Sequence, residues 1–181
     1  MIDPLLPTAI ALGFAFLFVA AAWHKLSARG RFEAILRDYR LLPEFLVRPI
    51  AMLMPVIELT LGLGWISGLS PRGTALASAV LLATYALAMT INLVRGRIYI
   101  ECGCGFGTST GEEQALSSSL VARNILLIVL ALLPLAPTTG RDLGTFDFLV
   151  VVGSVLTAIL LYAGSGQLIR NRAAIITWRG K

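Results

Sequence analysis

Five long apolar stretches, joined by short polar connections, constrain the fold of this chain more than any other feature. They occupy residues 5–23, 46–69, 74–94, 116–136 and 146–168. At a rise of about 1.5 Å per residue, each is long enough to cross a hydrocarbon core about 30 Å thick. Only 14% of the residues are charged, whereas a soluble domain carries about a quarter. The sequence therefore predicts a single all-α domain, a polytopic bundle of five transmembrane helices in a lipid bilayer.

The connection between the first two stretches predicts one further helix. Apolar side chains recur there at helical spacing, from Phe32 to Leu42, with arginines on the opposite face. This pattern is typical of an amphipathic helix that lies on a membrane surface, and Pro43 ends it. The first stretch is predicted to be a retained helix and not a signal peptide, because Asp3 is the only charge before it and a signal peptide begins with a basic segment.

The basic residues predict one orientation in the membrane. In a five-helix arrangement, 13 of the 15 lysines and arginines fall on one side, and only Arg72 and Arg141 fall on the other. Basic connections face the cytoplasm, so the N-terminus is predicted outside the membrane, and the C-terminus and the connection between the third and fourth stretches are predicted on the cytoplasmic side. Because the net charge of +5 resides in these connections, it indicates topology, and no nucleic-acid partner is predicted.

The two cysteines of the chain lie together in a glycine-rich connection, residues 95–111. Cys102 and Cys104 are separated only by Gly103. Residues at i and i+2 have Cα atoms about 5.5–7 Å apart in an extended or turned backbone, which overlaps the range of disulfides, and glycine gives the necessary backbone freedom. So small a ring is strained, and strained disulfides are the labile or catalytic ones. The pair is therefore predicted to be redox-active and catalytic.

Two other interpretations of the cysteines are inert thiols and a metal clip. Structural zinc takes about four ligands, whereas this chain offers two cysteines and one histidine, His24. A Cu(I) site with two thiolates has no methionine cluster near the loop to support it. We therefore predict neither a metal nor a cofactor.

Three arginines are candidates to support the thiol chemistry. Arg95 and Arg97 precede the cysteines and Arg123 follows them at the same predicted membrane surface. Nearby cations lower the pKa of a thiol and so favour its reactive thiolate form. The alternative is that these arginines only anchor the helix ends on the basic side of the membrane.

His24 and Glu58 complete the predicted set. His24 lies at the inner end of the first stretch, where it either accepts a proton from an attacking thiol or sits in the interface beside Trp23. Glu58 falls near the middle of the second stretch, where an ionisable group is costly and indicates function. Two roles of Glu58 remain open. It either handles protons, or it forms an interhelical hydrogen bond to Asn92 or Thr90 that stabilises the packing of the bundle.

Several segments of the chain resemble the MauE family of methylamine-utilisation membrane proteins, which is related to DoxX-like proteins. The most specific is the arginine-flanked segment 92–97 with the following 100–104, which includes Glu101 and the Cys-Gly-Cys motif. Supporting similarity occurs in residues 23–26, 39–43 with 55–58, and 146–148 with 167–171. The resemblance thus covers nearly the whole chain, and Glu101 and Gly103 join the supporting residues because they lie within its motif.

The resemblance implies a role in the maturation of methylamine dehydrogenase. Family members act with a thioredoxin-like periplasmic partner, MauD, and are needed for accumulation of the disulfide-rich small subunit. The implied activity is thiol–disulfide exchange or electron relay. The resemblance implies a bacterial inner membrane, so that the N-terminus is predicted in the periplasm and the C-terminus in the cytoplasm. The family's substrates are periplasmic, whereas the charge pattern predicts a cytoplasmic cysteine loop. Either the cysteines take electrons from a cytoplasmic thioredoxin and pass them outward, or the loop folds back into the bundle and is reached from the periplasm.

Two alternatives to a thiol–disulfide oxidoreductase remain from the sequence. One is a non-enzymatic membrane scaffold that docks the thioredoxin-like partner, with cysteines that are merely structural. The other is a quinone-linked thiol oxidase, which needs a quinone pocket that the sequence does not visibly encode.

Overall fold

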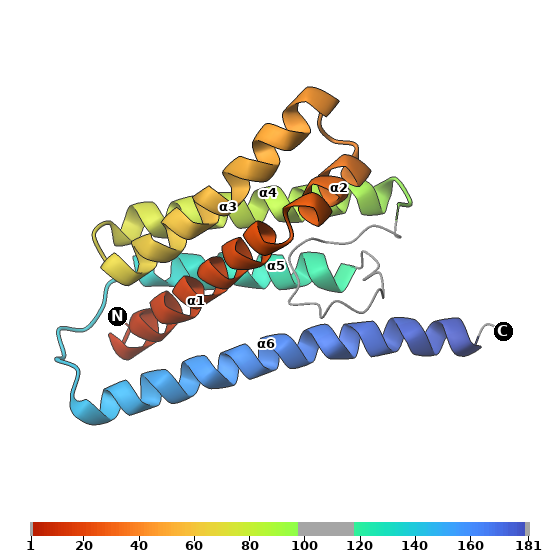
Figure 1. Ribbon diagram of the computed structural model, residues 1–181. Helices are drawn as coiled ribbons and strands as arrows, with labels where there is room; N and C mark the ends of the chain where they lie inside the picture. The colour runs from red at the N-terminus through yellow and green to blue at the C-terminus, as the bar shows by residue number, and fades with distance from the viewer. Residues whose placement is uncertain (1, 98–117, 180–181) are drawn as a thin grey trace.

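The structure, a computed structural model, describes residues 2–97 and 118–179, with side chains as far as Ser165 and at Leu168. Within these residues the fold is all α-helical, as predicted. The elements follow one another in the order α1 (Leu5–Ser27), α2 (Arg29–Tyr39), α3 (Glu44–Ser67), α4 (Pro71–Val94), α5 (Ser118–Leu132), the 3-10 turn η1 (Leu133–Leu135) and α6 (Thr145–Arg179) (Figure 1).

Five of the described helices are long and apolar enough to cross a membrane. They are α1, α3, α4, α5 together with η1, and the first part of α6, Thr145–Ser165. The remaining helix, α2, buries Phe32 and Tyr39 and exposes arginines on its other face. The prediction of a helical bundle with one amphipathic surface helix is therefore confirmed.

The main core forms where α1 crosses α3. The ring of Phe14 stacks on Phe18 at 5.9 Å and on Trp65 of α3 at 5.5 Å between ring centroids. Gly62 allows this close approach, because a Cβ atom there would lie 2.8 Å from Val19 Cγ2 and 3.3 Å from the carbonyl oxygen of Ala15. On the other side of the bundle, α4 packs against α5. These two helix pairs share one buried cluster.

The connections gather at two opposite ends of the bundle (Figure 1). At one end the N-terminal segment pairs with the α5–α6 connection, since Ile2 N–H donates to the Pro137 carbonyl at 3.0 Å and the Ile2 carbonyl accepts from Thr139 N–H at 2.8 Å. The other end, called here the loop end, contains α2, the end of α4 at Val94 and the beginning of α5 at Ser118. The two described residues that flank 98–117, Arg97 and Ser118, therefore both lie at the loop end.

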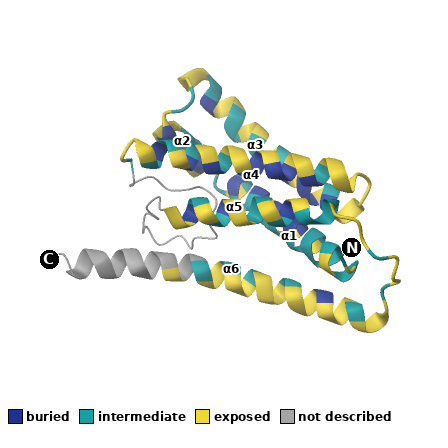
Figure 2. Cartoon of the chain, turned by 180° about the vertical axis from the view of Figure 1, so that it is seen from behind, coloured by how far each residue is buried: buried dark blue, intermediate teal, exposed yellow. Residues whose placement is uncertain are grey.

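The last helix is longer and more loosely packed than the others. α6 continues to Arg179, so the helix runs on past residue 168, where the predicted fifth apolar stretch ends. Only 6% of its apolar window is buried, against 33% for α4. It packs mainly along α1, and exposed residues cover most of its described length (Figure 2).

Candidate functional site

The predicted redox motif lies outside the described residues, but the structure defines how the chain enters it. Glu101, Cys102, Gly103 and Cys104 belong to residues 98–117. The helix α4 ends in a Schellman motif, in which Gly96 N–H donates to the Leu93 carbonyl at 3.0 Å and Arg97 N–H donates to the Asn92 carbonyl at 3.0 Å. Gly96 adopts the left-handed conformation that this cap requires, with φ at 71°.

The three predicted arginines lie at the loop end but differ in their surroundings. Arg95 is exposed at the C-cap of α4, and Arg97 is half-buried after it. Arg123 projects from α5 onto α6, with its guanidinium carbon 4.6 Å from the centroid of the Tyr162 ring. This cation–π contact ties α6 to the bundle. Arg123 thus has a structural contact in addition to its predicted role beside the cysteines.

A buried ionic cluster lies among α1, α3 and α4. Glu58 is 1% exposed and Lys25 is 3% exposed. The Lys25 ammonium donates to Glu58 Oε1 at 2.5 Å, and the Tyr85 hydroxyl donates to the same oxygen at 2.8 Å. Two rings flank the ammonium nitrogen, that of Phe32 at 5.3 Å and that of Tyr85 at 5.5 Å from their centroids. Each charged group therefore has a partner, as burial in a low dielectric demands.

The partners of Glu58 correct the sequence-based expectation. Asn92 Nδ2 donates instead to the Ala88 carbonyl at 3.1 Å, and Thr90 Oγ1 donates to the Ala86 carbonyl at 2.8 Å. A single amide or hydroxyl leaves the charge of a carboxylate uncompensated, whereas an ammonium neutralises it. The span containing Asn92 and Thr90 does reach Glu58, but through Tyr85.

Lys25 is the functional candidate that sequence reasoning missed. It was counted among the basic residues of the membrane surface, yet the structure buries it. The signal is its position on α1, because Phe14, Phe18, Ala22 and Lys25 follow one another at spacings of four, four and three residues and all are buried. A lysine on this buried stripe needs an acid opposite it, and Glu58 is the acid on the neighbouring span. His24, which precedes Lys25 in the sequence, is half-buried at the loop end.

The helix α4 carries a polar stripe on its buried side. Ser78, Tyr85 and Asn92 are seven residues apart, which places them on one face two turns from each other. Ser78 Oγ accepts from Trp65 Nε1 at 3.0 Å, and Tyr85 contacts Glu58. Among the described residues no group is bonded to Asn92 Oδ1 or Glu58 Oε2, although both atoms are buried. The stripe thus carries polar groups from Ser78, in the first third of α4, to the loop end.

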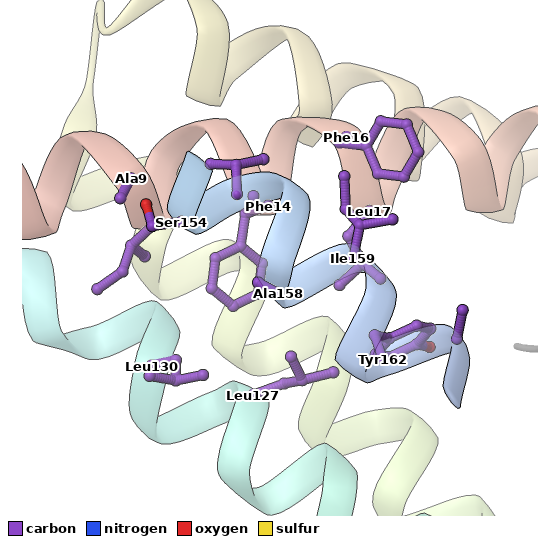
Figure 3. A pocket seen from close by; sticks show the side chains of 14 residues that line it. Ala9, Phe14, Phe16, Leu17, Leu127, Leu130, Ser154, Ala158, Ile159 and Tyr162 are labelled. Atoms are coloured by element: carbon purple, nitrogen blue, oxygen red, sulfur yellow. The ribbon is translucent and has the colours of Figure 1, made fainter. Parts of the chain in front are cut away.

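An apolar cavity of about 520 Å³ lies between α6 and parts of α1 and α5. Phe14 of α1, Leu127 and Leu130 of α5, and Ala158 and Ile159 of α6 surround it (Figure 3). Such a lining accommodates hydrocarbon chains. It includes none of the predicted redox residues, so the ionic cluster and the loop end remain the candidate site.

These features define the class of protein, a multi-pass α-helical membrane protein with an ionic cluster buried in its bundle. The model of the family described as "Methylamine utilisation protein MauE" matches residues 3–137. The chain belongs to this MauE family, as the resemblance indicated.

Relatives extend the similarity over most of the chain. A methylamine utilization protein MauE of Paracoccus denitrificans is 35% identical over 173 residues, covering 93% of this chain and 89% of the relative. The corresponding protein of Paracoccus versutus is 38% identical over 172 residues, with 92% and 88% covered. That of Methylorubrum extorquens is 33% identical over 169 residues, with 90% and 87% covered. No solved structure matches the chain significantly.

Proposed function

We propose that this protein is a thiol–disulfide oxidoreductase or electron relay of methylamine utilisation, working in the bacterial inner membrane through Cys102 and Cys104. The observation that carries the proposal is the placement of these two cysteines on the connection between two membrane-spanning helices, α4 and α5. Arginines at the described boundaries of that connection favour a thiolate. Family membership supplies the physiological context, since the relatives bear the name of methylamine utilization.

The proposed exchange proceeds through a mixed disulfide. One cysteine, as thiolate, attacks a disulfide of a thioredoxin-like periplasmic partner of the MauD kind and releases one partner sulfur. The second cysteine then attacks the mixed disulfide, closing the Cys102–Cys104 bond and leaving the partner as a dithiol. Two electrons and two protons pass to the partner, and the reverse sequence reduces the protein. The reduced partner then serves a maturing disulfide-rich substrate, by resemblance the small subunit of methylamine dehydrogenase.

Trapping of the mixed disulfide tests this function. The single variants Cys102→Ser and Cys104→Ser are incubated with a purified thioredoxin variant. In this thioredoxin the second active-site cysteine is replaced by serine, and the first forms a mixed disulfide with a chromogenic thiol. The variant that keeps the nucleophile should form a covalent adduct that dithiothreitol reverses. The double variant is the control and should form none.

A scaffold would give a different pattern. If neither single variant forms an adduct, and the double variant still supports accumulation of the periplasmic substrate in cells, the cysteines are structural and the proposed exchange is wrong. Loss of substrate accumulation in both single variants and in the double variant, with the membrane protein present at its normal level, supports the redox function.

A further inference from the structure

The cavity between α6 and parts of α1 and α5 exists because small residues line it. Ala9 and Gly13 of α1 and Ala158 of α6 belong to the lining, and a Cβ atom added at Gly13 would meet nothing within 4 Å. Protein interiors are normally packed without voids of this size, since wall atoms that face a void lose their dispersion contacts. A space of about 520 Å³ therefore favours an occupant, and hydrocarbon chains surround a protein in a bilayer.

The walls of the cavity favour a hydrocarbon chain over most of their length. Ala9 and Ser154 lie at one end of the lining and Tyr162 at the other (Figure 3). Ser154 already donates its hydroxyl proton to the Val151 carbonyl at 2.8 Å, so it offers no free donor to a ligand. The lining residues of α6 run from 154 to 163, which is about 14 Å along the helix axis. The cavity therefore suits a linear apolar chain.

A cation lies beside the cavity on the side of the loop end. Arg123 precedes Leu127 and Leu130 of the lining by four and seven residues, so all three lie on one face of α5. Its guanidinium carbon is 4.6 Å from the centroid of the Tyr162 ring, which is itself part of the lining. Arg123 is five residues from the beginning of α5 at Ser118, within reach of the membrane surface for a long basic side chain. The guanidinium thus marks the loop-end limit of the cavity.

The charge of Arg123 specifies the chemistry of the other end of the ligand. Among the described residues, none of the ion pairs, such as that of Lys25 with Glu58, includes Arg123. A cation within an apolar span is costly unless an anion pairs with it. A guanidinium binds phosphate through two parallel hydrogen bonds, and basic pockets between membrane helices on the cytoplasmic side bind anionic lipid headgroups. Arg123 and the cavity together therefore fit one amphiphile with an anionic head and a hydrocarbon chain.

We propose that the cavity binds an anionic phospholipid, with one acyl chain between α6 and α1 and the phosphate on Arg123. The lipid supplies contacts that α6 lacks, since only 6% of the apolar window of α6 is buried and the helix packs mainly along α1. A phospholipid bound from the leaflet at the loop end thus joins α6 to the bundle. The inference does not depend on the cysteine chemistry, so failure of the proposed function leaves it intact.

Photocrosslinking tests the site on the full-length, delipidated protein in detergent. Phosphatidylglycerol with a diazirine near the end of one acyl chain should label peptides that contain residues 9–17, 127–130 and 154–163. Phosphatidylcholine with the same chain should require about tenfold more lipid for half-maximal labelling, because its choline group offsets the charge that strengthens a hydrogen bond to Arg123. Arg123→Gln should weaken labelling by phosphatidylglycerol about tenfold and abolish the preference. Arg29→Gln, at an exposed cation of the loop end, is the control and should keep it.

Filling the cavity provides a second measurement. Phosphatidylglycerol should raise the unfolding temperature of the wild-type protein, because a ligand that binds only the folded state stabilises it. Ala158→Phe places a ring in the cavity and should remove both the chain labelling and this rise. Ala83→Phe, at an exposed alanine of α4 outside the lining, is the control and should retain both.

Several results would overturn the proposal. Equal labelling by the two headgroups, insensitive to Arg123→Gln, shows a cavity that takes hydrocarbon without recognising an anion. Labelling that a short-chain ubiquinone displaces and excess phosphatidylglycerol does not shows that a quinone is the occupant. Labelling that persists unchanged in Ala158→Phe shows lipid on the outer surface only. Should Ala158→Phe fail to assemble, the comparison of Arg123→Gln with Arg29→Gln decides, because equal losses in the two show only general attraction of charge.

Discussion

At the scale of single residues, Lys25 is predicted from the sequence to lie at the membrane surface, but in the structure it is buried and paired. In the sequence it is one of many basic residues after an apolar stretch. In the structure its ammonium is 2.5 Å from Glu58 and the residue is 3% exposed. A long lysine side chain near the end of a helix usually extends toward water, but this one turns into the bundle. The presence of a buried acid on α3 explains the difference.

A double-mutant cycle on this pair should reveal strong coupling. Lys25→Met leaves the Glu58 carboxylate buried without its counterion, and breaking a buried pair in this way costs about 3–5 kcal/mol. Lys25→Met combined with Glu58→Gln removes both charges and should recover much of that loss. Unfolding titrations in detergent mixtures measure the four free energies.

The exposed pair of Arg37 and Glu44 is the matched control for this cycle. Its atoms approach to 2.6 Å, but the side chains are 49% and 70% exposed, so the same cycle should give less than about 1 kcal/mol of coupling. Simple additivity, with the double variant losing as much free energy of unfolding as Lys25→Met and Glu58→Gln together, would show that the Lys25–Glu58 attraction contributes nothing, contrary to our expectation.

At the scale of helices, the crossing of α1 and α3 sets the geometry of the ionic cluster. Lys25 belongs to α1 and Glu58 to α3, so the separation of these helices determines whether the two groups meet. Gly62 lies one turn beyond Glu58 on the same helix and faces α1, where a Cβ atom on it would meet Ala15 and Val19. Close helix contacts through small residues are typical of membrane bundles. Packing at Gly62 and charge pairing at Glu58 are therefore linked.

Enlarging Gly62 should weaken both the bundle and the ion pair. Gly62→Ala places a Cβ atom 2.8 Å from Val19 Cγ2 and 3.3 Å from a backbone oxygen of α1, and overpacking of this kind costs about 1–3 kcal/mol. Gly62→Leu should cost more and raise the exchange rate of the buried cluster with deuterated solvent. Gly13→Ala is the control, because a Cβ atom there meets nothing within 4 Å. Equal stability of the two alanine variants would contradict the tight crossing.

At the scale of the whole molecule, apolar length and periodicity were sufficient to predict the helices, and the contacts between them were not predictable. The five apolar stretches and the amphipathic α2 follow from residue spacing alone, since each pattern depends on a single helix. Glu58 was likewise recognisable from its own helix alone, because it is an acid within an apolar stretch. Its partner was not, because Lys25 lies 33 residues away and only the packing of α1 on α3 brings the two together.

The charges of the molecule favour one orientation even after the burial of Lys25 is taken into account. At the end that carries the N-terminus, Arg141 is partly neutralised, as it pairs with Asp3 at 3.5 Å and with Asp147 at 2.8 Å. At the loop end, Arg29, Arg40 and Arg95 are exposed. Pairing lowers the free positive charge at both ends, since at the loop end Lys25 pairs with Glu58 and Arg37 pairs with acids, but the loop end keeps the larger number of basic residues. We therefore expect the loop end to face the cytoplasm.

Cysteine labelling in intact cells tests this orientation. In a background of Cys102→Ser and Cys104→Ser, single cysteines are introduced as Ser70→Cys, in the exposed α3–α4 turn, and as Ser119→Cys, in the exposed first turn of α5 at the loop end. A membrane-impermeant maleimide should label the first in intact cells and the second only after permeabilisation. The reverse pattern would show that the loop end faces the periplasm.

The native cysteines, labelled in the same way after treatment with a reductant, then distinguish the two routes to a periplasmic partner. Labelling that requires permeabilisation, as for Ser119→Cys, indicates a pair that takes electrons on the cytoplasmic side and passes them outward. Labelling in intact cells, with Ser119→Cys still protected, indicates a connection that enters the bundle and is reached from the periplasm, because backbone without helical structure is tolerated at membrane depth only when protein or a water-filled cavity surrounds it. The charge pattern leads us to expect the first result.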